Sequence, residues 1–84
     1  MKIGQKIVVV DNGETYTTYS DFNSLNICEE DFTHYDAPEE WSIGIVIGKS
    51  KHESSGERIY GIEVNNKKYV IGKHGIKKIK NMNG

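Results

Sequence analysis

The chain has 84 residues, of which 36% are hydrophobic, and its eleven Lys and Arg nearly balance its twelve Asp and Glu. This length predicts a single domain over residues 1–84, since so short a chain buries only about 60–65% of its unfolded surface. The near-neutral charge argues against a general nucleic-acid binder. The single cysteine, Cys28, excludes an intramolecular disulfide, and residues 1–6 carry no apolar run suited to a signal peptide or a membrane span. We therefore expect a cytoplasmic protein with no membrane partner.

The charges are divided sharply along the chain. Residues 11–41 contain nine acidic residues and no Lys or Arg, whereas residues 42–84 contain nine basic and three acidic residues. Such an asymmetry indicates either an interaction surface or two halves that neutralise each other across the fold. Both interpretations stay open at this point.

The first elements surround a long acidic excursion over residues 11–41. Residues 6–10 form a short apolar run that predicts a buried strand, and Asp11-Asn12-Gly13 predicts the turn that ends it. Residues 15–19 are typical of a partly exposed strand or of the arm of a loop. Ser20 as an N-cap, with apolar residues three apart, predicts one short helix near residues 20–26. We expect the rest of the excursion to be a loop.

The next strand begins at Trp41 and alternates with a period of two. Trp41, Ile43, Ile45 and Ile47 share one face, and the other face carries Ser42, Gly44, Val46 and Gly48. Glycines in a strand permit the close approach of a neighbouring strand. A polar connection over residues 49–57 follows.

Residues 58–72 predict a β-hairpin, because two runs rich in β-branched and aromatic residues flank Asn65-Asn66. A two-residue turn there sets Val64 opposite Lys67, Glu63 opposite Lys68, Ile62 opposite Tyr69, and Tyr60 opposite Ile71. The register therefore predicts one apolar face made by Tyr60, Ile62, Val64, Tyr69 and Ile71. The opposite face, with its Glu63–Lys68 pair, is suited to water.

The end of the chain completes a small barrel in this interpretation. Residues 72–75 predict a turn or a single 3₁₀ turn, residues 76–80 a last short strand, and residues 81–84 a frayed tail. The element order resembles an SH3-like five-stranded small β-barrel with a long excursion after its first strand. Closure of five short strands would hide the edges of the sheet.

The opening of the chain carries a second resemblance. Residues 4–19, with the sequence Gly-Gln-Lys-Ile-Val-Val-Val-Asp-Asn-Gly-Glu-Thr-Tyr-Thr-Thr-Tyr, are similar to the start of a group of short, uncharacterised bacteriophage proteins, in which this opening precedes an SH3-like core. The chain lacks the ALYDY-type segment and the paired tryptophans of peptide-binding SH3 domains. The resemblance therefore implies a phage source and transfers no residue role.

No residue pattern predicts an enzyme, a metal site or a cofactor site. Acidic neighbours disfavour the thiolate of Cys28, which catalysis would need. His34, His52 and His74 lie in separate predicted loops without ligand spacing. Adjacent carboxylates such as Glu29-Glu30 are typical of a solvated run. We expect a non-enzymatic binding module without a cofactor.

Two binding hypotheses follow from the divided charge. The first is an accessory protein that binds or inhibits a host protein with a basic surface through an acidic, aromatic arm. The residues of this arm are Glu29, Glu30, Asp31, Phe32, Tyr35, Asp36, Glu39, Glu40 and Trp41. The alternative is a nucleic-acid or small-nucleotide binding (sequestering) protein that uses the basic half, with Trp41, Tyr60 or Tyr69 as stacking partners. Its candidate residues are Lys49, Lys51, Arg58, Lys73, His74 and Lys77. A homodimer is a further expectation, because dimerisation is a common remedy for the marginal stability of so small a domain.

Overall fold

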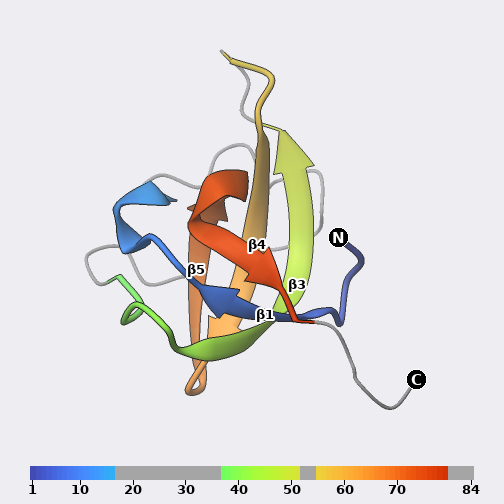
Figure 1. Ribbon diagram of the computed structural model, residues 1–84. Helices are drawn as coiled ribbons and strands as arrows, with labels where there is room; N and C mark the ends of the chain where they lie inside the picture. Colours follow the sequence, from blue (N-terminus) through green and yellow to red (C-terminus); the bar gives the residue numbers. More distant parts are fainter. Residues whose placement is uncertain (17–36, 52–54, 80–84) are drawn as a thin grey trace.

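The protein is mostly β, and its described residues form one antiparallel sheet (Figure 1). The computed structural model describes residues 1–16, 37–51 and 55–79. The strands are β1 (Lys6–Val9), β2 (Thr15–Tyr16), β3 (Ile43–Lys51), β4 (Arg58–Val64), β5 (Lys67–Gly72) and β6 (Ile76–Lys78), and two 3₁₀ turns, η1 (Asn12–Glu14) and η4 (Lys73–Gly75), connect some of them. The strand order is β2-β5-β4-β3-β1-β6. No α-helix occurs in the described ranges.

The predicted closure into a five-stranded barrel is wrong. The sheet has a sixth strand, β2, and β2 and β6 form its two ends without pairing with each other. These edge strands contain two and three residues. Because such short edges expose few unpaired backbone groups, the sheet does not need closure to protect them. The predicted helix near residues 20–26 and the tail over residues 81–84 lie outside the described residues.

The hairpin predicted around Asn65-Asn66 is confirmed. Asn65 and Asn66 have φ values of 51° and 66°, the positive values that a type I′ turn requires at both central positions. The pairing of β4 with β5 has the predicted register, including Ile62 opposite Tyr69 and Tyr60 opposite Ile71. All five side chains of the predicted apolar face are buried. They form most of a core in which no described polar or charged residue is buried.

The opposite face of this hairpin is only partly polar. Glu63 and Lys68 face each other there and are half-buried, as expected for a pair that meets water. Ile59 and Val70 share that face and are nevertheless buried. The prediction of a water-facing surface therefore holds for the tip of the hairpin and fails toward its base.

Strand β3 turns its small residues inward. Gly44 and Val46 are buried, whereas Ile43 and Ile45 are 58% and 40% exposed. A Cβ atom on Gly44 would collide with the Glu63 carbonyl oxygen and lie 2.6 Å from Cγ2 of Val64. The predicted role of glycine in the close approach of a neighbouring strand is thus confirmed at Gly44, and this approach leaves the large isoleucines outside.

The connection between β5 and β6 is the predicted 3₁₀ turn. Its last residue, Gly75, accepts backbone hydrogen bonds from Val10 and Asp11 at 2.8 and 3.2 Å. A Cβ atom on Gly75 would lie 2.7 Å from the Ile71 side chain, so only glycine fits there without rearrangement. This turn therefore fixes the position of β6 against the end of β1. Within the described ranges, no helix has both the length and the apolar character to cross a membrane.

Candidate functional site

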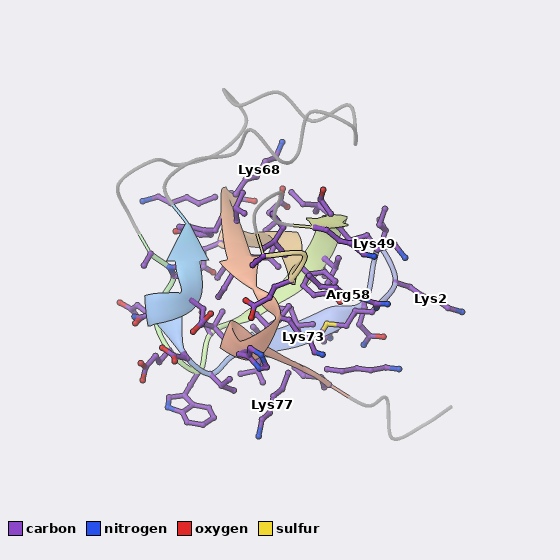
Figure 2. The ribbon with its side chains drawn as sticks, turned by 90° about the horizontal axis from the view of Figure 1, so that it is seen from above. Lys2, Lys49, Arg58, Lys68, Lys73 and Lys77 are labelled. Carbon is purple, nitrogen blue, oxygen red and sulfur yellow. The ribbon has the colours of Figure 1, made fainter. Side chains whose placement is uncertain are left out.

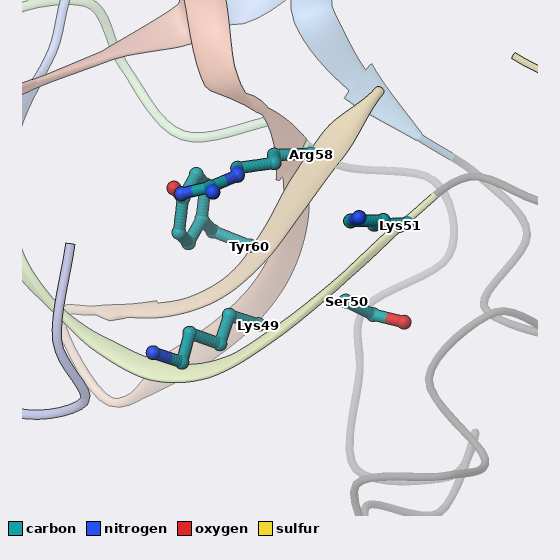
Figure 3. Close-up of a pocket in the computed structure, with 5 residues that line it drawn as sticks. All are labelled: Lys49, Ser50, Lys51, Arg58 and Tyr60. Carbon is teal, nitrogen blue, oxygen red and sulfur yellow. The ribbon is translucent and has the colours of Figure 1, made fainter. Parts of the chain in front are cut away.

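A β-bulge in β3 brings basic side chains onto the inner face of the sheet. Val46 pairs with Ile62 and Gly48 pairs with Gly61, so Ile47 is an extra residue on β3. A bulge of this kind shifts the alternation of the side chains that follow it. As a result, Lys49 lies opposite Tyr60 and Lys51 opposite Arg58. Figure 3 shows Lys49 and Lys51 on one side of β3 and Ser50 on the other.

These side chains line a pocket of about 240 Å³ at the free end of β3 and β4 (Figure 3). Its lining residues are Lys49, Ser50, Lys51, Arg58 and Tyr60. Tyr60 is 3% exposed, so it forms the floor of the pocket, and both lysines and Arg58 are exposed around it. The pocket therefore combines an aromatic floor with a cationic rim.

A second pocket of about 280 Å³ continues the cationic rim. It is lined by Gly56, Glu57, Arg58, Lys73 and His74. Arg58 belongs to both pockets, which therefore adjoin. We call the surface formed by Lys49, Lys51, Arg58, Lys73 and His74 the basic groove.

Among the described residues, three cations of the basic groove have no carboxylate partner. Arg58, Lys49 and Lys73 form no ion pair with a carboxylate of the described residues. Glu57 is the one carboxylate that lines either pocket of the groove in the described part of the chain. Clustered cations around a concave surface raise the local concentration of anionic ligands. Arg and Lys side chains bind the oxygens of phosphate and carboxylate groups, so this surface has the chemistry of an anion site.

The structure thus brings together five of the six basic residues suggested by the sequence. The exception is Lys77, which lies on β6 opposite Val8 and lines neither pocket. In Figure 2, Lys77 lies apart from Lys49 and Arg58. Sequence reasoning missed the lining residues Ser50, Gly56 and Glu57, because the candidates were chosen by their positive charge, which none of these three carries.

The predicted stacking role of the tyrosines is wrong. Tyr60 and Tyr69 are 3% and 5% exposed, so neither ring offers a free face to a nucleobase. Trp41 is 70% exposed but precedes β3, eight residues before Lys49. Trp41 lines neither pocket of the basic groove. The groove can therefore contact phosphates but lacks an aromatic platform among the described residues.

The described part of the acidic arm is a short turn before β3. The positions Glu29, Glu30, Asp31, Phe32, Tyr35 and Asp36 lie outside the described residues, whereas Glu39, Glu40 and Trp41 are described and exposed. The strand begins at Ile43 rather than at Trp41, because a turn from Glu39 to Ser42 precedes it. A pocket of about 390 Å³ separates this turn from the tip of the β4–β5 hairpin, with Pro38, Glu39, Asn65 and Lys67 among its lining residues.

Metal-binding geometry is absent from the described part of the chain. No three His, Cys, Asp or Glu residues gather there in a way that could hold a metal ion. His74 lies in the basic groove, where neighbouring cations disfavour a metal cation. The expectations that involve Cys28, His34 and His52 fall outside the described residues.

Comparison of the chain with protein-family models, curated proteins and solved structures finds no match.

Proposed function

We propose that the protein is a non-enzymatic module that binds nucleic acid through the phosphate backbone, using the basic groove. The observation that carries this proposal is the bulge at Ile47. The extra residue aligns Lys49 and Lys51 with Arg58 on one face, and Lys73 and His74 extend the same cationic surface. A regular strand would place alternate residues on opposite faces in the unshifted register, with Lys49 and Lys51 turned away from Arg58.

The size of the pockets favours the phosphate backbone over an enclosed nucleotide. Each pocket by itself, at about 240 and 280 Å³, is smaller than the roughly 300–1,000 Å³ typical of small-molecule sites, and the exposed lysines and Arg58 leave the groove open to solvent. The buried tyrosine rings offer no stacking surface, so base recognition has no support in the groove. Contacts with phosphates alone carry no direct sequence information. We therefore expect binding that depends little on base sequence.

The affinity should be modest and strongly dependent on salt. The whole chain has a formal net charge of −1, so only the local groove attracts a polyanion. Non-specific binders typically have Kd values of about 10⁻⁴–10⁻⁶ M at physiological salt. Binding should therefore be measured at low ionic strength first and followed as salt is added.

The experiment is a fluorescence anisotropy titration of labelled single-stranded and duplex oligonucleotides. The test variant is Lys49→Ser/Lys51→Ser in the groove. Its matched control is Lys77→Ser/Lys78→Ser on β6, which removes the same charge from a place outside both pockets. We expect the groove variant to bind about tenfold more weakly, with a log–log salt slope lower by about 1.4 for single strands, since each lost phosphate contact contributes about 0.7.

Two results would contradict the proposal. One is a wild-type protein that binds no oligonucleotide even at low ionic strength. The other is an equal loss of affinity in the groove variant and its control, which would indicate only an effect of net charge. A thermal-shift screen with mononucleotides separates strand binding from nucleotide sequestration, and we expect little shift because neither pocket encloses a nucleotide.

We also infer an SH3-like arrangement of the strands, in an open rather than a closed sheet. The support for this inference is the neighbour order β6-β1-β3-β4-β5, with a 3₁₀ turn between β5 and β6. A bacteriophage source is a separate proposal that rests on the resemblance of the opening stretch. An experimental structure in which β1 fails to lie between β3 and β6 would contradict the inferred arrangement.

A second proposal is protein binding through the acidic arm, favoured by the exposed turn that carries Glu39, Glu40 and Trp41. An exposed aromatic side chain between carboxylates suits a host protein with a basic surface. Replacement of Glu29, Glu30, Asp31, Glu39 and Glu40 by the corresponding amides should abolish capture of such a partner while the thermal unfolding midpoint is retained. A partner that is still captured would contradict this proposal.

A further inference from the structure

Three cationic side chains come together at one end of the sheet. Lys51 of β3 lies directly opposite Arg58 of β4. On the other side of β4, Ile59 lies opposite Gly72, which Lys73 follows directly. Arg58 and Lys73 also line the same pocket, and Figure 2 shows them close together. Arg58 therefore has a lysine on each side, and we call Lys51, Arg58 and Lys73 the cationic row.

The cationic row is unfavourable for the stability of the folded chain. Side chains directly opposite each other on neighbouring strands have Cβ atoms about 5 Å apart, and like charges there repel each other. No carboxylate of the described residues forms an ion pair with the row, although Glu57 lines the same pocket as Arg58 and Lys73. Arrangements that lower stability in this way are expected at functional sites, because a bound ligand relieves them.

The positive charge of the row exceeds the negative charge of one internal phosphate in a nucleic-acid strand. An internal phosphate carries a single negative charge. A phosphate monoester carries about −1.5 to −2 charges at pH 7 and has three strong acceptor oxygens, whereas a carboxylate has one charge and two oxygens. The three cations therefore match the charge and the acceptor oxygens of a phosphate monoester, and His74 lines the same pocket as a further donor.

The rest of the basic groove has room for few further phosphates. Lys49 lies two residues before Lys51 on the same side of β3, about 7 Å away along the strand. Nearer the start of β3 the inner face is closed by Val46, which is fully buried. A nucleic-acid strand can therefore place one phosphate at the row and the next near Lys49. With so few contacts, the extra charge on a single phosphate has a large effect on the affinity.

We propose that the cationic row binds the terminal phosphate of a nucleic-acid strand, while Lys49 contacts the phosphate that follows it. This inference rests on the proposed binding of nucleic acid, and it adds a preference for strand ends that carry a phosphate monoester. The position of Lys49 favours a nucleic acid over a phosphorylated peptide, because every nucleotide of a strand brings another phosphate.

The experiment compares short single-stranded oligonucleotides of one sequence that differ only at their ends. Each carries a fluorescent dye on a central base and ends in a 5′-phosphate, a 3′-phosphate or hydroxyl groups alone. A hydroxyl-ended oligonucleotide that is one nucleotide longer controls for added charge. In anisotropy titrations of the whole chain at low ionic strength, we expect a phosphate at one of the two ends to raise the affinity at least about fivefold.

The outcomes separate this inference from the proposed function. Equal affinities of the three oligonucleotides would overturn the preference for a strand end and leave the binding of nucleic acid in place. Absence of binding by all of them would contradict both proposals. A peptide with one phosphoserine should bind at least about tenfold more weakly than the phosphate-ended oligonucleotide, because it has no second phosphate for Lys49. A phosphopeptide that binds equally well would overturn the assignment to a strand end.

Arg58→Gln tests the row itself. The substitution removes the central charge of the row, so the preference for the phosphate-ended oligonucleotide should fall below about twofold. Lys49→Gln is the matched control, because it removes the same charge from a groove residue outside the row. It should weaken the binding of all the oligonucleotides and leave the preference unchanged. A preference that falls equally in both variants would reflect only the overall charge and would contradict the proposal.

Lys73→Gln provides a second test outside the paired strands. Lys73 is exposed in the 3₁₀ turn, so at low ionic strength the variant should unfold at the same temperature as the wild type or at a slightly higher one. It should lose at least about half of the preference for the phosphate-ended oligonucleotide, since one of the three cations around the phosphate is removed. A folded Lys73→Gln variant with the full wild-type preference would overturn the proposed site.

Discussion

The two ends of β3 differ in what they turn toward the inside of the sheet. Before the bulge at Ile47, Gly44 and Val46 are buried inside and Ile43 and Ile45 face outward. After it, the inner face carries Lys49 and Lys51 beside Tyr60 and Arg58. One inserted residue thus separates a packed inner face, before the bulge, from a cationic inner face after it.

The two ends of β3 differ because they pair with different numbers of strands. Strand β1 pairs with β3 only from Ile43 to Ile45, so β3 has a neighbouring strand on both sides there and its inner face packs into the core. From Gly48 onward β3 pairs with β4 alone. Cationic side chains are tolerated there because their charged groups reach water while Tyr60 closes the core beneath them. The inner face of one strand can therefore pack into the core before a bulge and bind a ligand after it.

The largest expected effect is at the packed end. Gly44→Ala should lower the free energy of unfolding by about 3 kcal/mol, because the new methyl group collides with the Glu63 backbone, which cannot rotate away. Chemical denaturation measured by circular dichroism gives this value. Binding of an oligonucleotide to the folded fraction should persist, since the basic groove lies beyond the bulge.

Gly13→Ala is the matched control for this substitution. A Cβ atom on Gly13 would meet only the flexible Asp11 side chain, at 3.1 Å. The loss should stay below about 1 kcal/mol, as for most surface changes. Equal losses in both alanine variants would mean that the approach of β4 to Gly44 is looser than described.

A smaller effect distinguishes the inner and outer faces of β3 before the bulge. Val46→Ala should cost about 2 kcal/mol, because it removes fully buried methyl groups from the core. Ile45→Ala, one residue earlier, should cost less than about 1 kcal/mol, since that side chain is 40% exposed. Denaturant midpoints of the two variants at equal protein concentration test this ranking. The reverse order would show that the isoleucine face is the buried one.

Local signals in the sequence are sufficient for the hairpin and the 3₁₀ turn. Asn65-Asn66 tolerates positive φ, and the alternation on both sides then fixes which residues pair, so the register of β4 and β5 is determined within a short stretch. The same holds for the turn at Lys73–Gly75. The local sequence thus predicts both features, although hydrogen bonds from Val10 and Asp11 hold the 3₁₀ turn in place.

The orientation of β3 depends on contacts that its own residues do not reveal. Alternation predicts two faces but not which of them meets the core, and that choice is made by the approach of Glu63 to Gly44. Gly48, next to the bulge at Ile47, is a weak marker of it, because a glycine inside a strand can also indicate the close approach of a neighbouring strand. The basic residues can therefore be proposed from their charge. Only the strand pairing shows that Lys77, on β6, lies apart from the other five residues.

The bulge itself provides the last test of the comparison. Insertion of one alanine directly after Ile47 should keep the bulge and shift every later residue of β3 by one position, which places Gly48 opposite Tyr60 and turns Lys49 and Lys51 outward. Affinity for an oligonucleotide should then fall about tenfold, equivalent to about 1.4 kcal/mol, with no change in net charge. Deletion of Ile47 is the matched control, because it makes the pairing regular and leaves Lys49 opposite Tyr60 and Lys51 opposite Arg58. If the insertion variant retains a folded spectrum and full affinity, the alignment of Lys49 and Lys51 with Arg58 is not what binds the phosphates.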